Sequence, residues 1–566
     1  MSPLNQPNHH HNLMIKIVSV AIIALISAAL FAPSSSATNN NIYDTLSAIP
    51  QDEHQNTPQT EQITAEDPQT HEQTAGESHE ESAPGKHDAH AKPEGYQIPP
   101  LWAVAPFAAL LLCIAILPLI KKTEHWWEHN RNRLFISLVL SVLVILYYWF
   151  IHPGVIDHNT HQLVTNFKAV NQVLNHAILA EYIPFIILLF SLYVISGGIR
   201  LQGDLPAHPR TNVIFLAVGA GIASFIGTTG AAMLLIRPLL HTNSERKHVV
   251  HTVIFFIFLV CNVGGSLLPI GDPPLFLGYL KGVPFPWTFN LWPQWLATVI
   301  VLLIIYYIWD TIAYRKEAVK DLKRDETQIQ KLALRGKINF LWLFGVVLSV
   351  AFLIPEKPFL YSIFPDKNLP EIPNFLREIM QLLFVAFSLM STPRGIRTEN
   401  KFNYLAIGEV AALFIGIFIT MQVPVEILQQ KGPDMGLTQP WHFFWATGTL
   451  SSFLDNAPTY VVFFETAGAI PPIEGQAVMD GLQTATGTIS IQMLVAISLG
   501  AVFMGANTYI GNGPNFMVKS IAEQSGIKMP SFFGYMIYSV GILVPIFIVL
   551  TLVMTYIFGG NWLIFG

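Results

Sequence analysis

Two aspartates lie inside strongly apolar stretches of the chain, where a charge is costly. Asp272 belongs to the string IGDPPLF, residues 270–276, and Asp455 to the string SSFLDNAPTY, residues 451–460. A charged side chain at the centre of a bilayer costs about 3 kcal/mol on insertion scales, so it is expected to face a cavity. A carboxylate in such a cavity can hold either a proton or a metal ion. We therefore predict that both aspartates bind cations and protons in competition.

Amide and hydroxyl side chains accumulate around both aspartates, and their oxygens suit hard cations such as Na⁺. The candidate ion-binding residues are Thr228, Thr229, Asp272, Asp455, Asn456, Thr459, Asn507, Asn512 and Asn515. Direct contacts to Na⁺ are predicted for Asp455, Asn456 and Asn512. In the alternative interpretation, these side chains only satisfy backbone groups that helix breaks set free, and Asp455 caps a helix at the tip of a hairpin.

A second acidic pair, Glu181 and Glu409, joins Asp272 and Asp455 as candidates for coupling to protons. Glu409 has apolar or glycine neighbours on both sides, which places it deep in its segment. Glu181 lies near the start of a segment, where an acidic residue would equally complement the helix dipole. Because the two glutamates occupy matched positions in a repeat, a shared structural task, such as bracing a hairpin, is the alternative.

The elements that must position these residues occur twice in the chain. Residues 181–240 and 409–468 align without a gap at an offset of 228, so that residues 224–229 (SFIGTT) correspond to residues 452–457 (SFLDNA). Residues 270–276 correspond to 510–516 at an offset of 240. Apolar segments interrupted by Gly, Pro, Asp or Asn at corresponding places in two halves are typical of secondary transporters with a site near the bilayer midplane.

The composition requires a membrane for most of the chain. Of the 566 residues, 52% are hydrophobic and only 12% are charged, against about 25% charged residues in soluble proteins. The two cysteines, Cys113 and Cys261, lie in apolar segments and predict no disulfide framework. The apolar segments cover residues 99–120, 133–151, 182–200, 212–240, 249–283, 291–313, 338–354, 371–390, 403–424, 440–470, 485–528 and 531–558.

Three basic loops, residues 121–133, 314–337 and 391–402, are predicted to be cytoplasmic by the positive-inside rule. With these loops fixed, segments 212–240 and 440–470 must be re-entrant hairpins that enter from opposite sides. Segments 249–283 and 485–528 then cross as broken helices. We predict an all-α polytopic membrane protein of two inverted-topology repeats, residues 99–313 and 338–566, joined by the cytoplasmic linker 314–337. Four breaks predict one shared cavity, since lipid does not tolerate non-helical backbone.

The N-terminal region has a different composition. Residues 1–37 resemble a signal peptide cleaved within 32–37, with an uncleaved first helix as the alternative. Residues 38–98 hold twelve acidic and two basic residues and predict a disordered periplasmic tail. Its five histidines would hold Zn²⁺ weakly or sense pH, or simply belong to a solvated tail. Together these features predict a multi-pass protein of the cell inner membrane.

The strings at 451–460 and at 505–516 (GANTYIGNGPNF) resemble those of the NhaD-type sodium/proton antiporters. These antiporters belong to the ion transporter superfamily, together with citrate-transporter-like proteins, arsenite permeases and dicarboxylate carriers. The resemblance covers about residues 99–558. It implies two inverted repeats with re-entrant hairpins, a homodimer, and elevator-like motion of a transport domain over a scaffold.

The resemblance also implies a division of the ion site between the halves. Residues 455–459 and 511–515 would form one half, and residues 228–229 and 271–274 the other. The chain departs from the dicarboxylate carriers, whose hairpins carry Ser-Asn-Thr where this chain has Gly-Thr-Thr at 227–229 and Asp-Asn-Ala at 455–457. A carboxylate at a hairpin tip should repel a dicarboxylate.

The predicted function is secondary transport that exchanges Na⁺ or Li⁺ for H⁺, with Asp455 as the main shared binder and Asp272 and Glu409 as supporting acids. The alternative is a carrier for a citrate-like dicarboxylate or an oxyanion. An enzyme is not expected, because the aspartyl-protease, nucleophile-elbow and His-Glu-x-x-His signatures are missing near the breaks. The expected partners are inorganic cations, protons and the lipid bilayer; no cofactor and no nucleic acid are expected.

Overall fold

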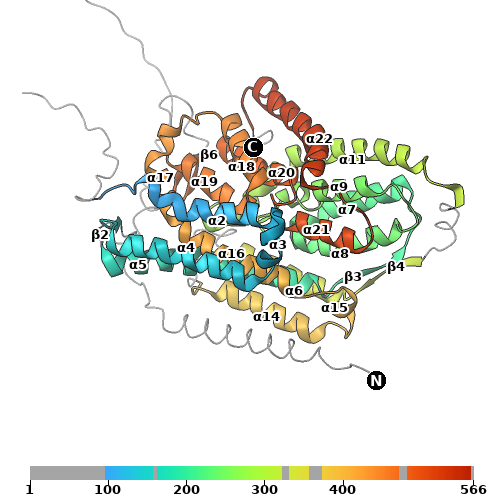
Figure 1. Cartoon of the computed structure of the whole chain (residues 1–566), viewed down its shortest axis with the longest axis horizontal. Coiled ribbons are helices and arrows are strands. Elements are labelled where there is room, and N and C mark those ends of the chain that lie inside the picture. The colour runs from blue at the N-terminus through green and yellow to red at the C-terminus, as the bar shows by residue number, and fades with distance from the viewer. Residues whose placement is uncertain (1–95, 157–161, 321–329, 356–371, 471–480, 563–566) are drawn as a thin grey trace, which may run out of the picture.

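The computed structural model describes residues 96–156, 162–320, 330–355, 372–470 and 481–562. The signal peptide predicted over 1–37 lies outside the described residues, as does the tail predicted over 38–98 except for its last three residues. The described chain is mainly helical (Figure 1), as predicted. Within it, six helices are long and apolar enough to span a membrane, or seven if residues 405–420 and 422–435, which meet at a bend of 43°, form one span.

The first half of the described chain is built mainly of helices. They are α2 (Ala105–Ile116), α3 (Lys121–Trp127), α4 (Asn130–Phe150), α5 (Asn166–Leu174), a π-helical stretch (Asn175–Tyr182), α6 (Ile183–Ser196), α7 (Pro209–Ile226), α8 (Thr228–Thr242), α9 (Val250–Leu259), α10 (Pro273–Leu280) and α11 (Trp292–Tyr314). Short 3-10 turns cover Leu101–Val104, Leu117–Leu119, Val263–Ser266 and Phe285–Leu291. The segment predicted over 182–200 belongs to a longer helix that starts at Asn166.

The second half is also built mainly of helices. Its helices are α13 (Ile338–Phe352), α14 (Leu376–Ser391), α15 (Ile396–Glu399), α16 (Leu405–Thr420), α17 (Gln422–Lys431), α18 (Pro440–Phe453), α19 (Asn456–Gly468), α20 (Ile491–Met504), α21 (Gly513–Gln524) and α22 (Phe532–Leu552). Two 3-10 turns, Gly432–Met435 and Gly505–Asn507, and a π-helical stretch, Val553–Ile557, complete it.

Short antiparallel ribbons, which the sequence analysis did not anticipate, connect some of the helices. The ribbons among the described residues pair β1 (Val155–Ile156) with β2 (Leu163–Val164), β3 (Arg200–Asp204) with β4 (Gln330–Arg335), and β5 (Gly481–Thr484) with β6 (Gly487–Ser490). In the second ribbon Arg200 pairs with Arg335. This pairing attaches part of the segment predicted as a basic linker to the end of α6.

The helix breaks fall where the sequence places Gly, Asp, Asn and Pro. Gly227 separates α7 from α8 with a φ of +77°, a left-handed conformation that favours glycine. Leu454 and Asp455 separate α18 from α19. Two prolines begin α10, and Pro514 lies in the first turn of α21, a position where the missing N–H does no harm. The pairs α7–α8 and α18–α19 lie toward opposite ends of the molecule (Figure 1).

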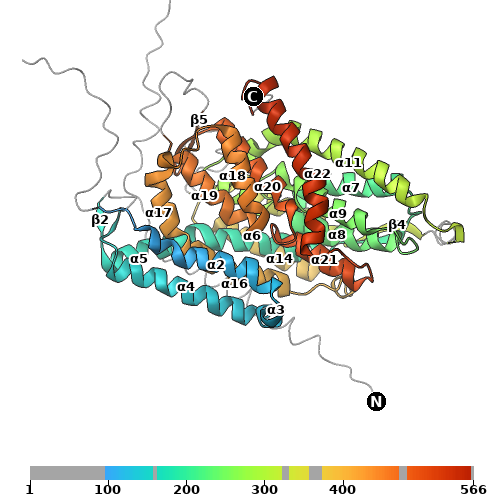
Figure 2. The same cartoon turned by 45° about the horizontal axis from the view of Figure 1, so that its top comes forward.

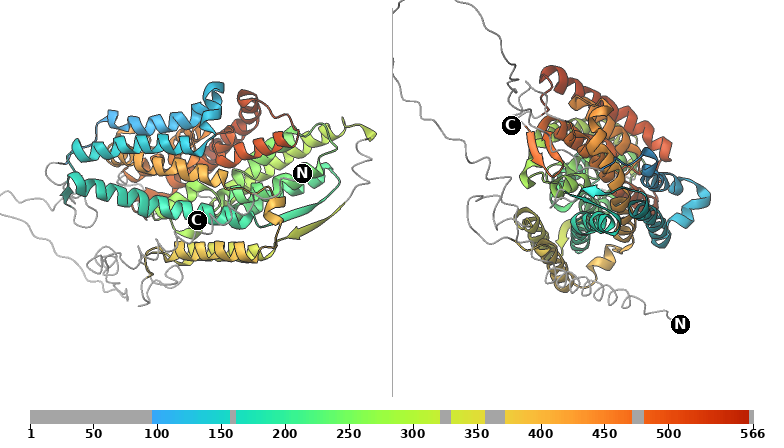
Figure 3. Two further views of the ribbon diagram at one scale, coloured as in Figure 1. Left: turned by 60° about the horizontal axis from the view of Figure 1, so that its bottom comes forward. Right: turned by 90° about the vertical axis from the view of Figure 1, so that its left-hand side faces the viewer.

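The broken helices occupy the centre of the bundle and the long helices surround them. In α20 every residue from Leu494 to Met504 is buried, and α9 is buried along nearly its whole length, as expected for helices enclosed by protein on all sides. By contrast, α4 exposes Leu138, Val142 and Leu146 along one face, which suits contact with lipid. Figure 2 shows α22 steeply inclined to α2 and α4, and the left panel of Figure 3 shows α14 (yellow) along the outside.

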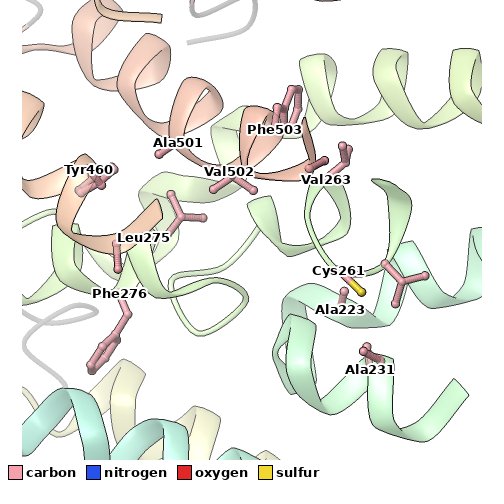
Figure 4. Close-up of a cluster of buried hydrophobic side chains, with 14 of the residues drawn as sticks. Ala223, Ala231, Cys261, Val263, Leu275, Phe276, Tyr460, Ala501, Val502 and Phe503 are labelled. Carbon is pink, nitrogen blue, oxygen red and sulfur yellow. The ribbon is translucent and has the colours of Figure 1, made fainter. Parts of the chain in front are cut away.

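Apolar packing continues from one half to the other around the breaks. Figure 4 labels Ala223, Ala231 and Cys261 of the first half together, with Val502 and Phe503 of the second half close to Val263. All of these side chains belong to one buried cluster. The four breaks are therefore enclosed in a common core, which fixes the polar residues that they carry.

Candidate functional site

Asp272 lies where the four breaks meet. Its side chain is buried, with 1% of the residue exposed. Oδ1 accepts hydrogen bonds from Thr228 Oγ1 and Asn512 Nδ2, both at 3.0 Å, and Oδ2 accepts one from Asn456 Nδ2 at 2.6 Å. Each donor stands at a different break: the start of α8, the residue before α21, and the start of α19. An ionised carboxylate is an acceptor only, so this arrangement satisfies its charged form.

The donors to Asp272 are related by the internal repeat of the sequence. Thr228 and Asn456 differ by the offset of 228, and each is the first residue of the second helix in its pair. Asp272 and Asn512 differ by the offset of 240, and they contact each other directly. The site is thus built from two pairs of corresponding positions, of which only the position of Asp272 is acidic.

Two serines brace the breaks in the same corresponding way. Ser224 Oγ donates to Gly264 O at 2.6 Å and accepts from Leu267 N at 2.9 Å. Ser452 Oγ donates to Met504 O at 3.1 Å and accepts from Asn507 Nδ2 at 2.9 Å. Each serine therefore binds the 3-10 turn of the broken helix beside it and satisfies backbone or amide groups that the break leaves without helical partners.

Asp455 begins α19 as its N-cap. Its Oδ1 accepts from the backbone N–H of Ala457 at 3.1 Å, and Thr459 Oγ1 donates to its carbonyl oxygen at 2.9 Å. The capping role weighed in the sequence analysis is therefore present. Asp455 also interacts electrostatically with Asp272, so that a second carboxylate charge acts on the first. The hydroxyl of Thr459 thus satisfies a backbone carbonyl group, as the alternative interpretation proposed. Thr229 is half-buried in the first turn of α8 and is not among the donors to Asp272.

Two amide oxygens at the second-half breaks, those of Asn456 and Asn507, are buried without a hydrogen-bond partner among the described residues. Asn456 uses its Nδ2 on Asp272, and its Oδ1 is buried and unpaired. Asn507 must donate its Nδ2 to Ser452, because that hydroxyl already donates to carbonyl groups, and its Oδ1 is likewise buried and unpaired. A buried polar atom without a partner costs about 1–3 kcal/mol. Carboxylate and amide oxygens together are the donor set of a hard cation.

Asn515 and Asn262 hold the break of the second half rather than contact Asp272. Asn515 Nδ2 donates to the carbonyl oxygens of Gly505 and Thr508, both at 2.9 Å. Asn262, a polar residue near the break of the first half, donates to Asn515 Oδ1 at 2.8 Å and accepts from Asn512 Nδ2 at 3.3 Å. An asparagine in an otherwise apolar segment was the available signal for Asn262.

The structure places Glu409 and Glu181 away from the Asp272 cluster. Glu409 forms an ion pair with Arg133 of α4 at 3.0 Å. Glu181 is buried and pairs at 2.7 Å with Lys281, which also contacts Glu465 of α19 at 2.9 Å. The two glutamates at matched sequence positions therefore have different partners, and each connects elements of the two halves.

A second buried polar network, which was not predicted from the sequence, surrounds Asp310 of α11. Arg246 donates to Asp310 Oδ2 at 3.2 Å, His251 Nε2 lies 2.9 Å from Oδ1, and Asn212 donates to Oδ2 at 3.1 Å. These residues connect α11 to the start of α7 and to the segment before α9. Asp310 is an acidic residue in an apolar segment, as Asp272 is, and this feature could have predicted a buried polar network here too.

Long apolar helices around buried, broken helices, with a polar cluster shared by both halves, define a polytopic secondary transporter of the membrane. The chain belongs to the family whose model is described as "Putative citrate transport", which matches residues 96–555. This match supports the superfamily predicted from the motifs, whereas the sodium/proton-antiporter branch stays a prediction. No curated relative matches the chain.

Proposed function

We propose that the protein exchanges Na⁺ or Li⁺ for H⁺, with Asp272 and Asp455 as the groups for which cation and proton compete. The observation that carries this proposal is the site of Asp272, which receives hydrogen bonds from three breaks, interacts electrostatically with Asp455, and contacts Asn456, whose amide oxygen is buried and unpaired. Na⁺ would take oxygens of Asp455, Asn456 and Asn507, close to the charge of Asp272.

Exchange follows from charge balance in this cluster. When Asp272 and Asp455 are ionised, the cluster carries two negative charges removed from water, and one bound cation or proton relieves their repulsion. A proton that binds one of the carboxylates would displace the cation, and the cation would then leave the site. If the site always holds one of the two ions and is never empty, movement of one ion down its gradient drives the other ion in the opposite direction.

The proposal extends to the architecture of transport. The two halves would be inverted-topology repeats, with α7–α8 and α18–α19 as re-entrant hairpins from opposite sides of the bilayer. The hairpins and broken helices would move as a transport domain against the surrounding long helices, in a homodimer of the inner membrane with residues 38–98 in the periplasm. Support comes from the opposite placement of the two helix pairs and the shared offsets of their hydrogen bonds.

Proton flux in proteoliposomes with a preformed pH gradient tests the proposal. Collapse of the gradient on adding Na⁺ or Li⁺, but not citrate, is the expected result. The exposed Asp434 provides a control, since Asp434→Asn should leave the flux unchanged. Silence toward every cation would contradict the proposal.

A citrate-like or oxyanion carrier is the second candidate, and the description of the family favours it. The charge of the site opposes it, because Asp272 and Asp455 would face a polyanion unless protons or cations neutralised them. Uptake of labelled citrate into the same proteoliposomes, independent of Na⁺, would establish this carrier.

A further inference from the structure

A polar cavity, distinct from the Asp272 cluster, opens between α8, α21 and the loop before α16. Its volume is about 280 Å³. The lining side chains that matter for its chemistry are Arg237, His241, Ser244, Lys401, Gln524 and Ser525. None of the described lining residues is acidic. The cavity therefore presents cationic groups and hydrogen-bond donors to whatever enters it.

Arg237 is the central group of this cavity. Its Nη1 is buried and has no hydrogen-bond partner. The guanidinium also interacts electrostatically with the hydroxyl of Tyr193 and, more weakly, with the like charge of Arg200, which pairs instead with Glu399. A buried guanidinium nitrogen without an acceptor is costly, and a neighbouring positive charge raises that cost. An anion in the cavity would supply the missing acceptor.

Lys401 adds a second cation from a different part of the fold. Its backbone has a φ of +50°, a left-handed conformation that is uncommon for a residue other than glycine. The adjacent Asn400 fixes the loop by donating to the carbonyl oxygens of Gly197 and Ile199 at the end of α6. The loop is thus held in a strained conformation with Lys401 at the cavity.

The acidic groups around the cavity do not neutralise it. Asp204 Oδ2 lies 3.8 Å from His241 Nε2, on the side of the β3–β4 ribbon. Glu245 accepts a hydrogen bond from the neighbouring Ser244. Both acidic residues thus contact the edge of the cavity, through His241 and Ser244, and neither forms an ion pair with Arg237. The balance of charge remains positive at the centre.

The cavity lies at the far ends of the two helices that begin at the ion site. Thr228 starts α8 and contacts Asp272, and Asn512 immediately precedes α21. At 1.5 Å per residue, Arg237 lies about 14 Å along α8 and Ser525 about 18 Å along α21. The two helices pack side by side (Figure 1), and Lys401 faces them from the segment between α15 and α16.

We propose that this cavity binds a phosphate group, supplied either by the headgroup of an anionic phospholipid or by free phosphate. Arginine matches phosphate oxygens with two parallel donors, and lysine adds a point charge. Basic pockets between membrane helices are known to take anionic headgroups. A bound phosphate would join α8 and α21 to the loop that Asn400 attaches to α6, and so restrain their relative movement.

Binding to the full-length protein in nanodiscs tests this site independently of transport. Thermal stability would be measured in phosphatidylcholine discs with and without inorganic phosphate, and in discs that contain phosphatidylglycerol. Lipid retained by the protein would be identified by native mass spectrometry. A stabilisation by phosphate in phosphatidylcholine discs assigns a free anion, and selective retention of phosphatidylglycerol assigns a headgroup.

Variants locate the effect. Arg237→Gln should weaken binding by about tenfold or more, since it removes a charge-assisted hydrogen bond. Lys401→Gly removes the second cation while relieving the left-handed backbone, so its loss of binding cannot be ascribed to misfolding. The exposed Lys121 serves as the matched control, and Lys121→Gln should bind normally. Absence of binding by either source, or equal binding by all variants, would overturn the site.

Discussion

The two halves of the chain meet at Asp272 with corresponding positions but different residues. The hairpin positions hold Thr228 in the first half and Asn456 in the second, and both donate to Asp272. The broken-helix positions hold Asp272 and Asn512. At the hairpin tips, Gly227 in the first half corresponds to Asp455 in the second. Each half therefore supplies one carboxylate, but at positions that do not correspond. Asp272 is a buried hydrogen-bond acceptor, whereas Asp455 caps a helix.

The largest expected effect comes from removing the carboxylate at the meeting point. Asp272→Asn should reduce Na⁺-driven proton flux in proteoliposomes to the level of empty liposomes, because the remaining amide cannot exchange a proton for a cation. The double variant Asp272→Asn with Asn512→Asp moves the carboxylate to the corresponding position of the other half. Partial recovery of flux in the double variant would show that the two positions are equivalent, and no recovery would show that they are not.

The second comparison concerns Asp455 and Gly227. Asp455→Asn should also abolish exchange while leaving insertion and folding intact, because asparagine caps helices about as well as aspartate. Proton flux and a thermal melting curve would be measured on the same preparation. Full activity in this variant would restrict Asp455 to its capping role and leave the exchange to Asp272.

A smaller effect is expected from the two hairpin donors, and it should differ between the halves. Thr228→Val removes one hydrogen bond to a charged group, which corresponds to about a tenfold weaker apparent affinity for Na⁺. Asn456→Ala removes both the donor to Asp272 and an unpaired oxygen, so its loss should be larger. The Na⁺ dependence of proton flux measures both, and the reverse order would contradict the assignment of the Asn456 oxygen to the cation.

The smallest effect should come from the two bracing serines. Ser452 bonds Gly448, Met504 and Asn507, whereas Ser224 bonds Gly264 and the N–H of Leu267. Each serine-to-alanine change should destabilise the protein by about 1–3 kcal/mol. Only Ser452→Ala should also disturb exchange, because it releases the side chain of Asn507. Denaturation of both variants in detergent, with flux as the second reading, checks this difference.

The sequence predicted the breaks and most of the residues around Asp272, because clustered Gly, Pro, Asp and Asn interrupt an apolar helix and leave polar groups that must be satisfied. It did not predict which carboxylate lies at the centre, since a helix cap and a buried acceptor are both aspartates in the sequence. The pairing of Lys281 with Glu181 and Glu465 joins positions 100 and 184 residues apart, and no local pattern encodes it. Strand β4 lies in the stretch 314–337, whose basic residues indicated only a loop, so the β3–β4 ribbon was not predicted.

The direct contact between Asp272 and Asn512 joins two corresponding positions that hold different residues. If two identical copies of one half assembled about a twofold axis, the contact would join aspartate to aspartate or asparagine to asparagine. The first would set two like charges against each other, and the second would leave no acidic group to titrate. Because the two corresponding positions belong to one polypeptide, they hold different residues, and a single acid faces an amide. The difference between the two corresponding positions is thus a condition of the proposed exchange.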